Sequence, residues 1–426
     1  MTSAGGRFLS QPSVRAIILV LTISFYLYYG VYKMLFAHFE LVGLHFLTGC
    51  IASNNFFDGR NIYEMPKGIN PFFYPPLSLI IYLPICLFGD QVAKACWFIL
   101  SHAMVFGAAW LTYKTCGVQN RTDALFAVLV SFGLSMPVQG LVLTGNINIF
   151  ILLGLAGTFY ALIAGKTNAS CAVLACLTWV KFYPAGLMLP FVWRQQWKAI
   201  RRYVFVVVAL GVVSVSIFGF EAHIAFLEQL SATYPIVSGA FQAVSFVYVV
   251  KLFVGEDYRQ LVVLGNAIFT TALLYLLWMR SRRMALSEHE GARLFVDLYI
   301  MLVVIMLAVP PSWVFWQAFL VPLQSVILFL WLQDRRRFRF IAVYAVLCGF
   351  ISEWEIIAYQ IHVPTVGLTI YEIGQRLNEF PTLFPILYST PFFLTAGVLA
   401  WLLLNYEALS LGVKTLAMAE YKGLHT

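Results

Sequence analysis

The stretch Asn54–Leu77, NNFFDGRNIYEMPKGINPFFYPPL, is the longest early interruption in a chain that is otherwise almost entirely apolar. It sets ionisable side chains beside tyrosines, phenylalanines and a double proline, and these side chains are Asp58, Arg60, Glu64 and Lys67. A polar segment of this kind between long apolar runs predicts an aqueous loop flanked by membrane spans. We therefore predict that it forms part of a functional surface on the outer face, above a cavity built by later spans.

Composition decides the class of protein. The chain has 426 residues, of which 61% are hydrophobic and only 11% charged, and its mean hydropathy is +0.83. Soluble domains carry about 25% charged residues, so this is an integral membrane protein, and spans of this composition predict an all-α fold. The net charge of +8 does not indicate nucleic-acid binding, because the cations sit at the ends of apolar runs, where they act as topology signals.

The first apolar run, 16–34, is long enough to span and has no small-residue cleavage site. Arg7 and Arg15 precede it, so residues 1–15 are expected to form a cytoplasmic tail. Residues 36–93 then form a first outer loop. Within it, 77–89 is too short to cross the bilayer upright, and Pro75–Pro76 predict a helix that lies in the outer leaflet.

A second decisive stretch is 169–193, which is broken in its middle by Lys181-Phe-Tyr-Pro184. A full crossing here would leave the basic cluster that begins at Arg194 outside, against the positive-inside rule. Two half-length helices that meet at Lys181 keep the cluster inside and place Lys181 on the wall of a cavity. The alternative is a lysine that snorkels to the interface.

The remaining chain predicts a second outer loop at 221–259 and later spans near 260–279, 296–309, 314–333, 340–358 and 386–405. With this topology every dense basic cluster is cytoplasmic. We expect one transmembrane domain, 1–426, of about 11–13 helices with juxtamembrane helices on the outer face.

The sequence lacks the motifs of several classes of membrane protein. The chain has no phosphate-binding GxxxxGK[ST] loop and no HExxH pair, so an ATP-driven pump and a zinc protease are both unlikely classes. The seven cysteines are scattered and form no CxxC pair, and we expect them to pack in the core rather than to form disulfides or bind metal. No metal or other cofactor is expected. Isolated carboxylates and cations near a membrane-level cavity suit a lipid-borne anionic substrate.

Four ordered landmarks carry a family resemblance: Gly59-Arg-Asn-Ile-Tyr63 with Phe73-Tyr-Pro-Pro-Leu77, Leu143-Thr-Gly-Asn-Ile-Asn148, Val180-Lys-Phe-Tyr-Pro184 with Trp193-Arg-Gln-Gln-Trp197, and Pro310-Pro-Ser-Trp313. In these the chain resembles the GT-C superfamily of polytopic glycosyltransferases, and within it glycosyltransferase family 87, which includes polyprenyl-phosphate-mannose-dependent mannosyltransferases. The resemblance implies a GT-C-like helical bundle, a polyprenyl-phosphate sugar as donor, and transfer on the extracytoplasmic face of the cell membrane.

The chain departs from the family at two polar positions. If Gly59 is the loop glycine of the family, the aspartate that members carry upstream of it is replaced here by His45, followed by Phe46. The histidine-containing tail of the last landmark is replaced by Val314-Phe-Trp-Gln317.

Three residues are candidates for the catalytic base, and each has a structural alternative. Asp58 could instead form a surface ion pair with Arg60, Glu40 could be a charge at the membrane interface, and His45 could be a packed side chain. Lys181, Lys251 and Arg259 could hold the phosphate, although Arg259 could also anchor a span at the interface. Tyr74, Trp313 and Trp316 could stack on a sugar or belong to the aromatic belt. The remaining substrate-binding candidates are Arg60, Tyr63, Asn146, Tyr183 and Gln242.

The sequence thus predicts a membrane glycosyltransferase of the cell envelope that transfers a mannose-like hexose from a polyprenyl-phosphate sugar to a lipid or glycan acceptor. Its partners would be these substrates and the membrane, with no nucleic acid. One alternative is a non-catalytic relative that translocates or binds lipid-linked sugars. Another is an ion-coupled transporter, for which Asp297 is the main intramembrane acid.

Overall fold

The computed structural model describes residues 11–32, 43–66, 69, 71–116, 120–237, 245–247, 250, 259–283, 290–309, 314–334 and 383–423. Every regular element in these ranges is a helix, and no strand occurs among them. The predicted all-α membrane fold is confirmed. The predicted span at 340–358 lies outside the described residues.

The elements, in chain order, are α2 (Pro12–Tyr26), the π-helix η1 (Leu27–Tyr32), α4 (Leu44–Phe57), the 3₁₀ helix η2 (Pro76–Ile81), α5 (Leu83–Cys86), α6 (Asp90–Thr115), α7 (Arg121–Gly133), α8 (Met136–Thr144), α9 (Asn148–Ile163), α10 (Thr167–Val180), the 3₁₀ helix η3 (Tyr183–Met188), α11 (Leu189–Trp193), α12 (Trp197–Val237), α14 (Arg259–Arg283), α15 (Glu290–Ala308), the 3₁₀ helix η5 (Val314–Leu320), α16 (Val321–Gln333), α20 (Leu383–Leu404) and α21 (Tyr406–Gly423).

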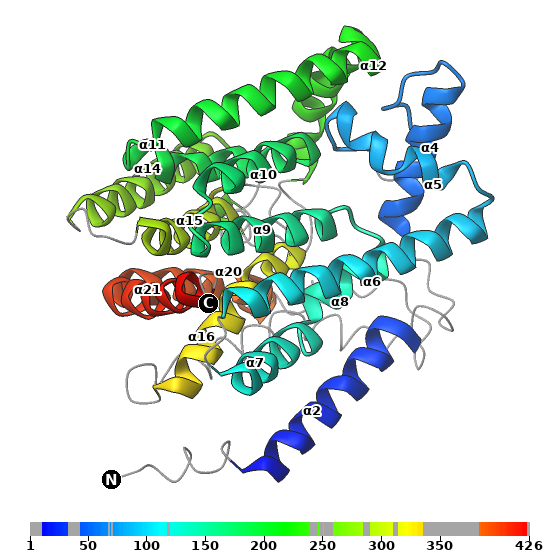
Figure 1. Ribbon diagram of the computed structural model, residues 1–426. Helices are drawn as coiled ribbons and strands as arrows, with labels where there is room; N and C mark the ends of the chain where they lie inside the picture. The colour runs from blue at the N-terminus through cyan, green and yellow to red at the C-terminus, as the bar shows by residue number, and fades with distance from the viewer. Residues whose placement is uncertain are drawn as a thin grey trace.

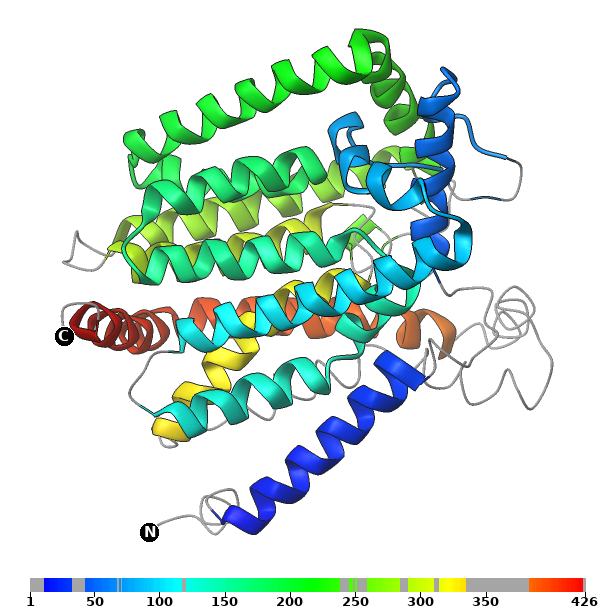
Figure 2. The same cartoon turned by 45° about the vertical axis from the view of Figure 1, so that its right-hand side comes forward.

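The long helices lie side by side as a bundle with two distinct ends (Figures 1 and 2). We call one end the basic end, defined by Arg15, Arg194 and Arg280; α2 begins there. We call the other the aromatic end, defined by Tyr74, Lys181 and the short helices α4 and α5.

Six described helices are long and apolar enough to cross a membrane, and the number rises to eight if each of two bent pairs is one span. One bent pair is α7 and α8, which meet at 54°. The helices α9 and α10 are apolar but shorter. The chain is a multi-pass membrane protein.

The segment around Lys181 folds back on itself. Helix α10 runs from the basic end to the aromatic end, and η3 and α11 return within the residues 183–193 to the basic end, where α12 begins (Figures 1 and 2). We call residues 167–193 the hairpin. Because its tip is irregular backbone at the level of the bundle, it requires burial against protein or water.

Residues 36–93 were predicted to form the first outer loop, and we call them the first outer segment. Their described part contains short helices that cannot cross a bilayer, as predicted. However, 77–89 is not one helix. It is divided into η2 and α5 at Tyr82, which ends one and precedes the other, because Pro84 in the first turn of α5 has no N–H to continue the preceding ladder.

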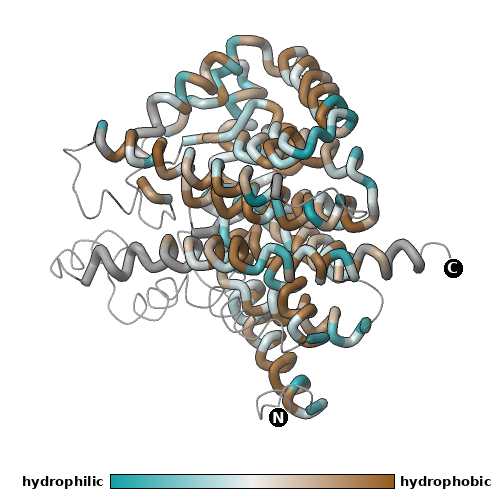
Figure 3. The backbone as a smooth tube through the Cα atoms, turned by 90° about the vertical axis from the view of Figure 1, so that its left-hand side faces the viewer, coloured by the Kyte–Doolittle hydropathy of each residue, from teal (hydrophilic) through white to brown (hydrophobic). Residues whose placement is uncertain are grey.

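The helices differ in how much of their surface the protein covers. In the most apolar window of α15, 83% of the residues are buried, whereas in that of α12 only 6% are. Many exposed side chains of α12 are large and apolar, including Phe205 at 67% and Val212 at 62%, so this part of α12 is suited to face lipid. Seen from the basic end, the bundle is largely hydrophobic along its helices (Figure 3), and α15 lies in its core.

The prediction that the cysteines pack in the core without disulfides is confirmed for Cys116 and Cys171, which are buried; Cys96 is half-buried, Cys176 is exposed, and two others are paired, contrary to the prediction. Cys50 of α4 and Cys86 of α5 form a disulfide with a Cα–Cα distance of 5.2 Å. Their sequence separation of 36 residues gave no motif, and only the fold-back of the first outer segment brings them together. Cys96, Cys116, Cys171 and Cys176 are not in disulfides, and Cys348 lies outside the described residues.

The turn between α8 and α9 holds the aromatic end together. Gly145 ends α8 at a φ of 65°, in the left-handed region. A Cβ at this position would lie 2.8 Å from the Cβ of Phe46 and 3.3 Å from the Cα of Gly43. The amide of Gly43 also donates to the carbonyl of Leu143 at 3.0 Å. The turn therefore needs glycine both for its backbone angle and for contact with α4.

We expect Gly145→Ala to lower the free energy of unfolding by about 2–4 kcal/mol, from left-handed strain and overpacking against Phe46. The control is Gly165→Ala, whose φ is 71° but which has no atom within 4 Å of its added Cβ. Thermal unfolding in detergent should show the larger loss for Gly145→Ala. Equal losses would show that contact with α4 contributes nothing.

Candidate functional site

Lys181 stands at the tip of the hairpin. It follows the last residue of α10 in an extended conformation, with φ −156° and ψ 146°. Pro184 lies in the first turn of η3, and we call η3 and α11, residues 183–193, the return limb of the hairpin. The extended residue and the proline reverse the chain where a continuous helix would have carried it onward. The reversal places the ammonium at the aromatic end of the bundle, partly buried.

The ammonium is surrounded by aromatic rings. Its Nζ lies 5.1 Å from the ring centroid of Trp316, 5.5 Å from that of Tyr74 and 5.7 Å from that of Tyr183. It donates a hydrogen bond of 3.2 Å to Oδ1 of Asn148. Among the described residues no carboxylate lies within ion-pair distance of Lys181. We call Lys181, Tyr74, Tyr183, Trp316 and Asn148 the lysine site.

The first outer segment supplies Tyr74. The hydroxyl of Tyr63 donates to the backbone carbonyl of Tyr74 at 2.9 Å, and the side-chain amide of Asn55 donates to the backbone carbonyl of Glu64 at 2.6 Å. Gly59, at a φ of 68°, lets the chain leave α4. These bonds fold the segment back on α4, so the two parts of the first sequence landmark act together to bring one ring to the lysine.

The return limb and η5 supply the opposite wall. The ring centroids of Tyr183 and Trp316 are 4.2 Å apart, and Phe319 lies 5.8 Å from Tyr183. Trp316 is only 3% exposed, so its ring belongs to the wall of the site rather than to an interfacial belt.

The turn between α8 and α9 supplies the polar contact. The side-chain oxygen of Asn146 accepts from the backbone amide of Asn148 at 3.0 Å, which fixes the turn just before α9. The sequence singled out Asn146, whereas Asn148 is the residue that contacts Lys181. Both asparagines were within the quoted landmark, and only the helical register of α9 distinguishes their roles.

His45, in the first turn of α4, lies close enough to Lys181 to feel its charge. Burial and the positive charge of Lys181 lower the pKa of His45 to about 4. The imidazole is therefore neutral near pH 7, the form that can accept a proton. α4 is not one of the candidate membrane spans.

Asp58 lies at the other end of α4. Its Oδ2 is 2.5 Å from Nη2 of Arg60, and the two side chains are 57% and 58% exposed. With a helical rise of about 1.5 Å per residue, Asp58 is roughly 20 Å from His45 along the helix. The structure therefore does not bring Asp58 and Arg60 together with the lysine site.

Other predicted site residues cannot be placed in the site. Glu40, Gln242, Lys251 and Trp313 lie outside the described residues. Arg259 begins α14, and its side chain is not among those described. Among the described residues, no three histidine, cysteine, aspartate or glutamate side chains gather as metal ligands.

The sequence did not predict an ion-pair partner for Asp297. Its Oδ2 is 2.6 Å from Nε of Arg194 at the basic end, and the carboxylate is fully buried. An acid committed to a buried ion pair does not suit the ion relay that a coupled transporter requires. No signal in the sequence linked these two residues, which are 103 positions apart.

The sequence model of glycosyltransferase family 87 matches residues 72–311, more than half of the chain. The matched range contains most of the lysine site, from Tyr74 to Tyr183, but ends before Trp316. No curated protein matches the chain.

The depressed pKa of His45 predicts an acid-sensitive fold. A histidine whose pKa falls from about 6.5 unfolded to about 4 folded binds more protons in the unfolded state between these values, so stability rises with pH across this window. We expect about 2–3 kcal/mol to be lost between pH 7 and pH 4 through this residue. In His45→Gln the thermal midpoint should fall less steeply over that range; identical slopes would contradict the prediction.

Proposed function

Because the chain belongs to glycosyltransferase family 87 and is therefore a multi-pass membrane glycosyltransferase, we propose that it transfers a mannose-like hexose from a polyprenyl-phosphate sugar. The acceptor is a lipid or glycan with a free hydroxyl, and transfer takes place on the extracytoplasmic face of the plasma membrane. The non-catalytic alternative, a subunit that binds or translocates such lipids, predicts the same ligand without a product.

The observation that carries the proposal is the partly buried ammonium of Lys181. It has an amide oxygen and three ring faces around it but no carboxylate within ion-pair distance among the described residues. A charge taken out of water without a partner is costly. The phosphate of a lipid-linked sugar supplies the missing anion. The cation–π contacts hold the ammonium without neutralising its charge, so the phosphate can bind and leave.

The reaction we propose is a direct displacement. The acceptor oxygen forms a bond to the anomeric carbon as the bond from that carbon to the phosphate oxygen breaks. The electron pair leaves with the polyprenyl phosphate, whose growing charge Lys181 stabilises. Asn148 holds Lys181 through its Oδ1, and its NH₂ group remains available to donate to the phosphate. The proposal requires no metal, since phosphate is already a good leaving group.

The acceptor proton must go to a base. Of the two candidates in the described part of the chain, Asp58 and His45, only His45 feels the charge of Lys181, and its imidazole is unprotonated at pH 7. We therefore propose His45 as the acceptor of this proton. Asp58 remains a second proposal only if the outer segment moves on substrate binding, because it lies in an exposed ion pair. Glu40 is a third.

Two features support an outer location for the aromatic end. The ordered cations Arg15, Arg194 and Arg280 gather at the opposite end, as expected of the cytoplasmic side. The disulfide between Cys50 and Cys86 lies at the aromatic end, and such bonds persist in oxidising compartments. The N-terminus is then cytoplasmic, because α2 starts at the basic end (Figure 1).

The activity is tested with purified protein in lipid vesicles, given polyprenyl-phosphate mannose or glucose and a membrane lipid extract as acceptor. Mass spectrometry should detect a product heavier by one hexose. Lys181→Met should lower kcat/KM by about 100-fold or more, the usual loss when one transition-state donor is removed. The control is Lys198→Met, an exposed lysine of α12. Binding of the donor without any product would favour the non-catalytic alternative.

The orientation is tested by thiol labelling of intact cells. A cysteine introduced at the exposed Asn61 should react with a membrane-impermeant maleimide. One introduced at the exposed Lys198, at the other end of the bundle, should react only after the cells are opened, with the unsubstituted chain as background. The reverse pattern would place the lysine site in the cytoplasm and overturn the proposed sidedness.

A further inference from the structure

The return limb of the hairpin cannot fix its own position. It consists of the 3₁₀ helix η3 and the five-residue α11, and Pro184 and Pro190 within it have no backbone N–H. Short 3₁₀ segments are weakly held by their own hydrogen bonds. Contacts with other elements must therefore determine where Lys181 stands.

One face of α15 supplies those contacts. Asp297, Met301 and Ile305 recur at helical spacing and so lie on the same side of α15. A Cβ at Gly186 of the return limb would lie 2.9 Å from Cδ1 of Ile305 and 3.9 Å from Cε of Met301. At the basic end, Arg194 reaches Asp297. The return limb thus runs antiparallel along a single face of α15, with a close approach in its middle and an ion pair at its end.

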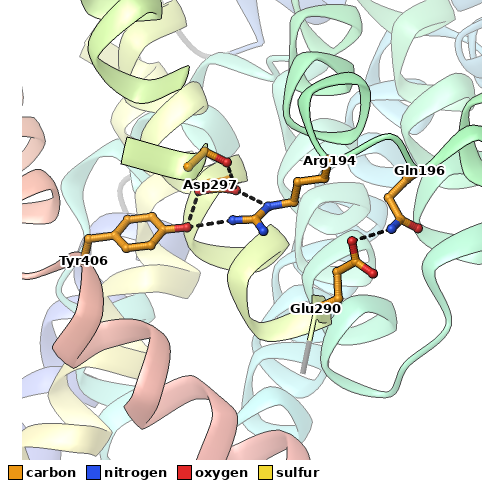
Figure 4. Close-up of polar contacts among 6 residues, drawn as sticks. Arg194, Gln196, Glu290, Asp297 and Tyr406 are labelled. Atoms are coloured by element: carbon orange, nitrogen blue, oxygen red, sulfur yellow. Dashed lines mark hydrogen bonds and ion pairs between the residues drawn. The ribbon is translucent and has the colours of Figure 1, made fainter. Parts of the chain in front are cut away.

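The ion pair is part of a buried network (Figure 4). Asp297 Oδ2 accepts from Nε of Arg194 at 2.6 Å and from the hydroxyl of Ser281 at 3.1 Å. Its Oδ1 accepts from the hydroxyl of Tyr406 at 2.6 Å, and that hydroxyl accepts from Nη2 of Arg194 at 3.0 Å. The network joins the end of the hairpin to α14, α15 and the C-terminal helix α21. Beside it, the amide of Gln196 donates to Glu290.

We propose that Asp297 is a positioning residue for Lys181: it holds Arg194, and through it the return limb, in the register on α15 that sets the depth of the lysine site. Tyr406 extends this function to α21, beyond the range that the family match covers. The activity arm of its test rests on the proposed function; the labelling arm does not.

The lysine site is sensitive to register. A slip of one residue along α15 moves the limb by about 1.5 Å. The hydrogen bond from Lys181 to Asn148, now 3.2 Å, would then exceed the distance at which such a bond exists. Loss of the ion pair between Arg194 and Asp297 at the basic end should therefore break the contact between Lys181 and Asn148 at the aromatic end.

The first experiment measures the position of Lys181 directly. A membrane-permeant amine-acylating reagent is applied to the full-length protein in vesicles, and peptide mass spectrometry gives the labelling rate of each lysine. In Asp297→Asn we expect the rate at Lys181 to rise about fivefold or more, because the hairpin opens more often. Lys198, already exposed, reports the reagent dose.

The matched control is Asp123→Asn. Asp123 also lies at the basic end, in an ion pair of 2.5 Å with Arg15 and a hydrogen bond of 2.8 Å from Gln333, but it ties α2 and α16 to α7 and does not touch the hairpin. It should lower the thermal midpoint without changing the labelling of Lys181. An unchanged rate in Asp297→Asn, or the same rise in Asp123→Asn, would overturn the proposal.

The second experiment is a double-mutant cycle on transfer. Asp297→Asn alone should lower kcat/KM by about 100-fold, as a small misplacement of a catalytic group does, while Asp123→Asn should keep it. In the Lys181→Met background, Asp297→Asn should cost little more, because its effect passes through Lys181. Losses that multiply would show a merely structural role for Asp297.

The outcomes separate the two claims. If wild type makes no product but labelling at Lys181 rises in Asp297→Asn, the proposed reaction fails and the positioning role stands. If Asp297→Asn does not fold, Tyr406→Phe removes the two hydrogen bonds of the hydroxyl, to Asp297 and from Arg194, and leaves the ion pair. It should raise the labelling of Lys181 in the same direction by a smaller factor, and no rise would overturn the proposal.

Discussion

The structure depends on a positive charge held at the tip of a broken helix inside a membrane protein. Irregular backbone at this depth exists only where protein or water covers it, and here the cover is aromatic. Tyr74 comes from the first outer segment, Tyr183 from the hairpin itself and Trp316 from η5. Three parts of the chain that are distant in sequence converge because one lysine has to be shielded from lipid and left open to an anion.

Much of this could be predicted from the sequence. The positive-inside rule, applied to the cluster after Trp193, required the chain to reverse at Lys181, and α10 ends there. The length of 77–89 excluded a crossing, and the segment forms only η2 and α5. These inferences succeed because bilayer thickness and charge placement constrain short stretches of sequence. Such a stretch can be interpreted without knowing which helices pack against it.

The rest depended on which helices become neighbours. The disulfide of Cys50, the pairing of Arg194 with Asp297, and the choice of Asn148 rather than Asn146 are long-range or register-dependent facts. Hydropathy indicates that a segment is in the membrane but not which face meets which helix. For the same reason the sequence treated Asp297 as an isolated acid, whereas its fully buried carboxylate is neutralised by a residue far earlier in the chain.

The bond between Cys50 and Cys86 also bears on how the protein is made. Both cysteines precede α6. If the aromatic end is extracytoplasmic, as proposed, α4 and α5, which we call the cap, reach that side before α6 is synthesised. An oxidising environment can then fasten this cap while most of the bundle is still being synthesised. A host that cannot oxidise thiols there, or a preparation kept in strong reductant, would yield a protein whose cap lacks this covalent bond. Ring packing, with the ring centroids of Tyr82 and Trp97 4.8 Å apart, and hydrogen bonds such as that from Gly43 to Leu143 would then have to hold it.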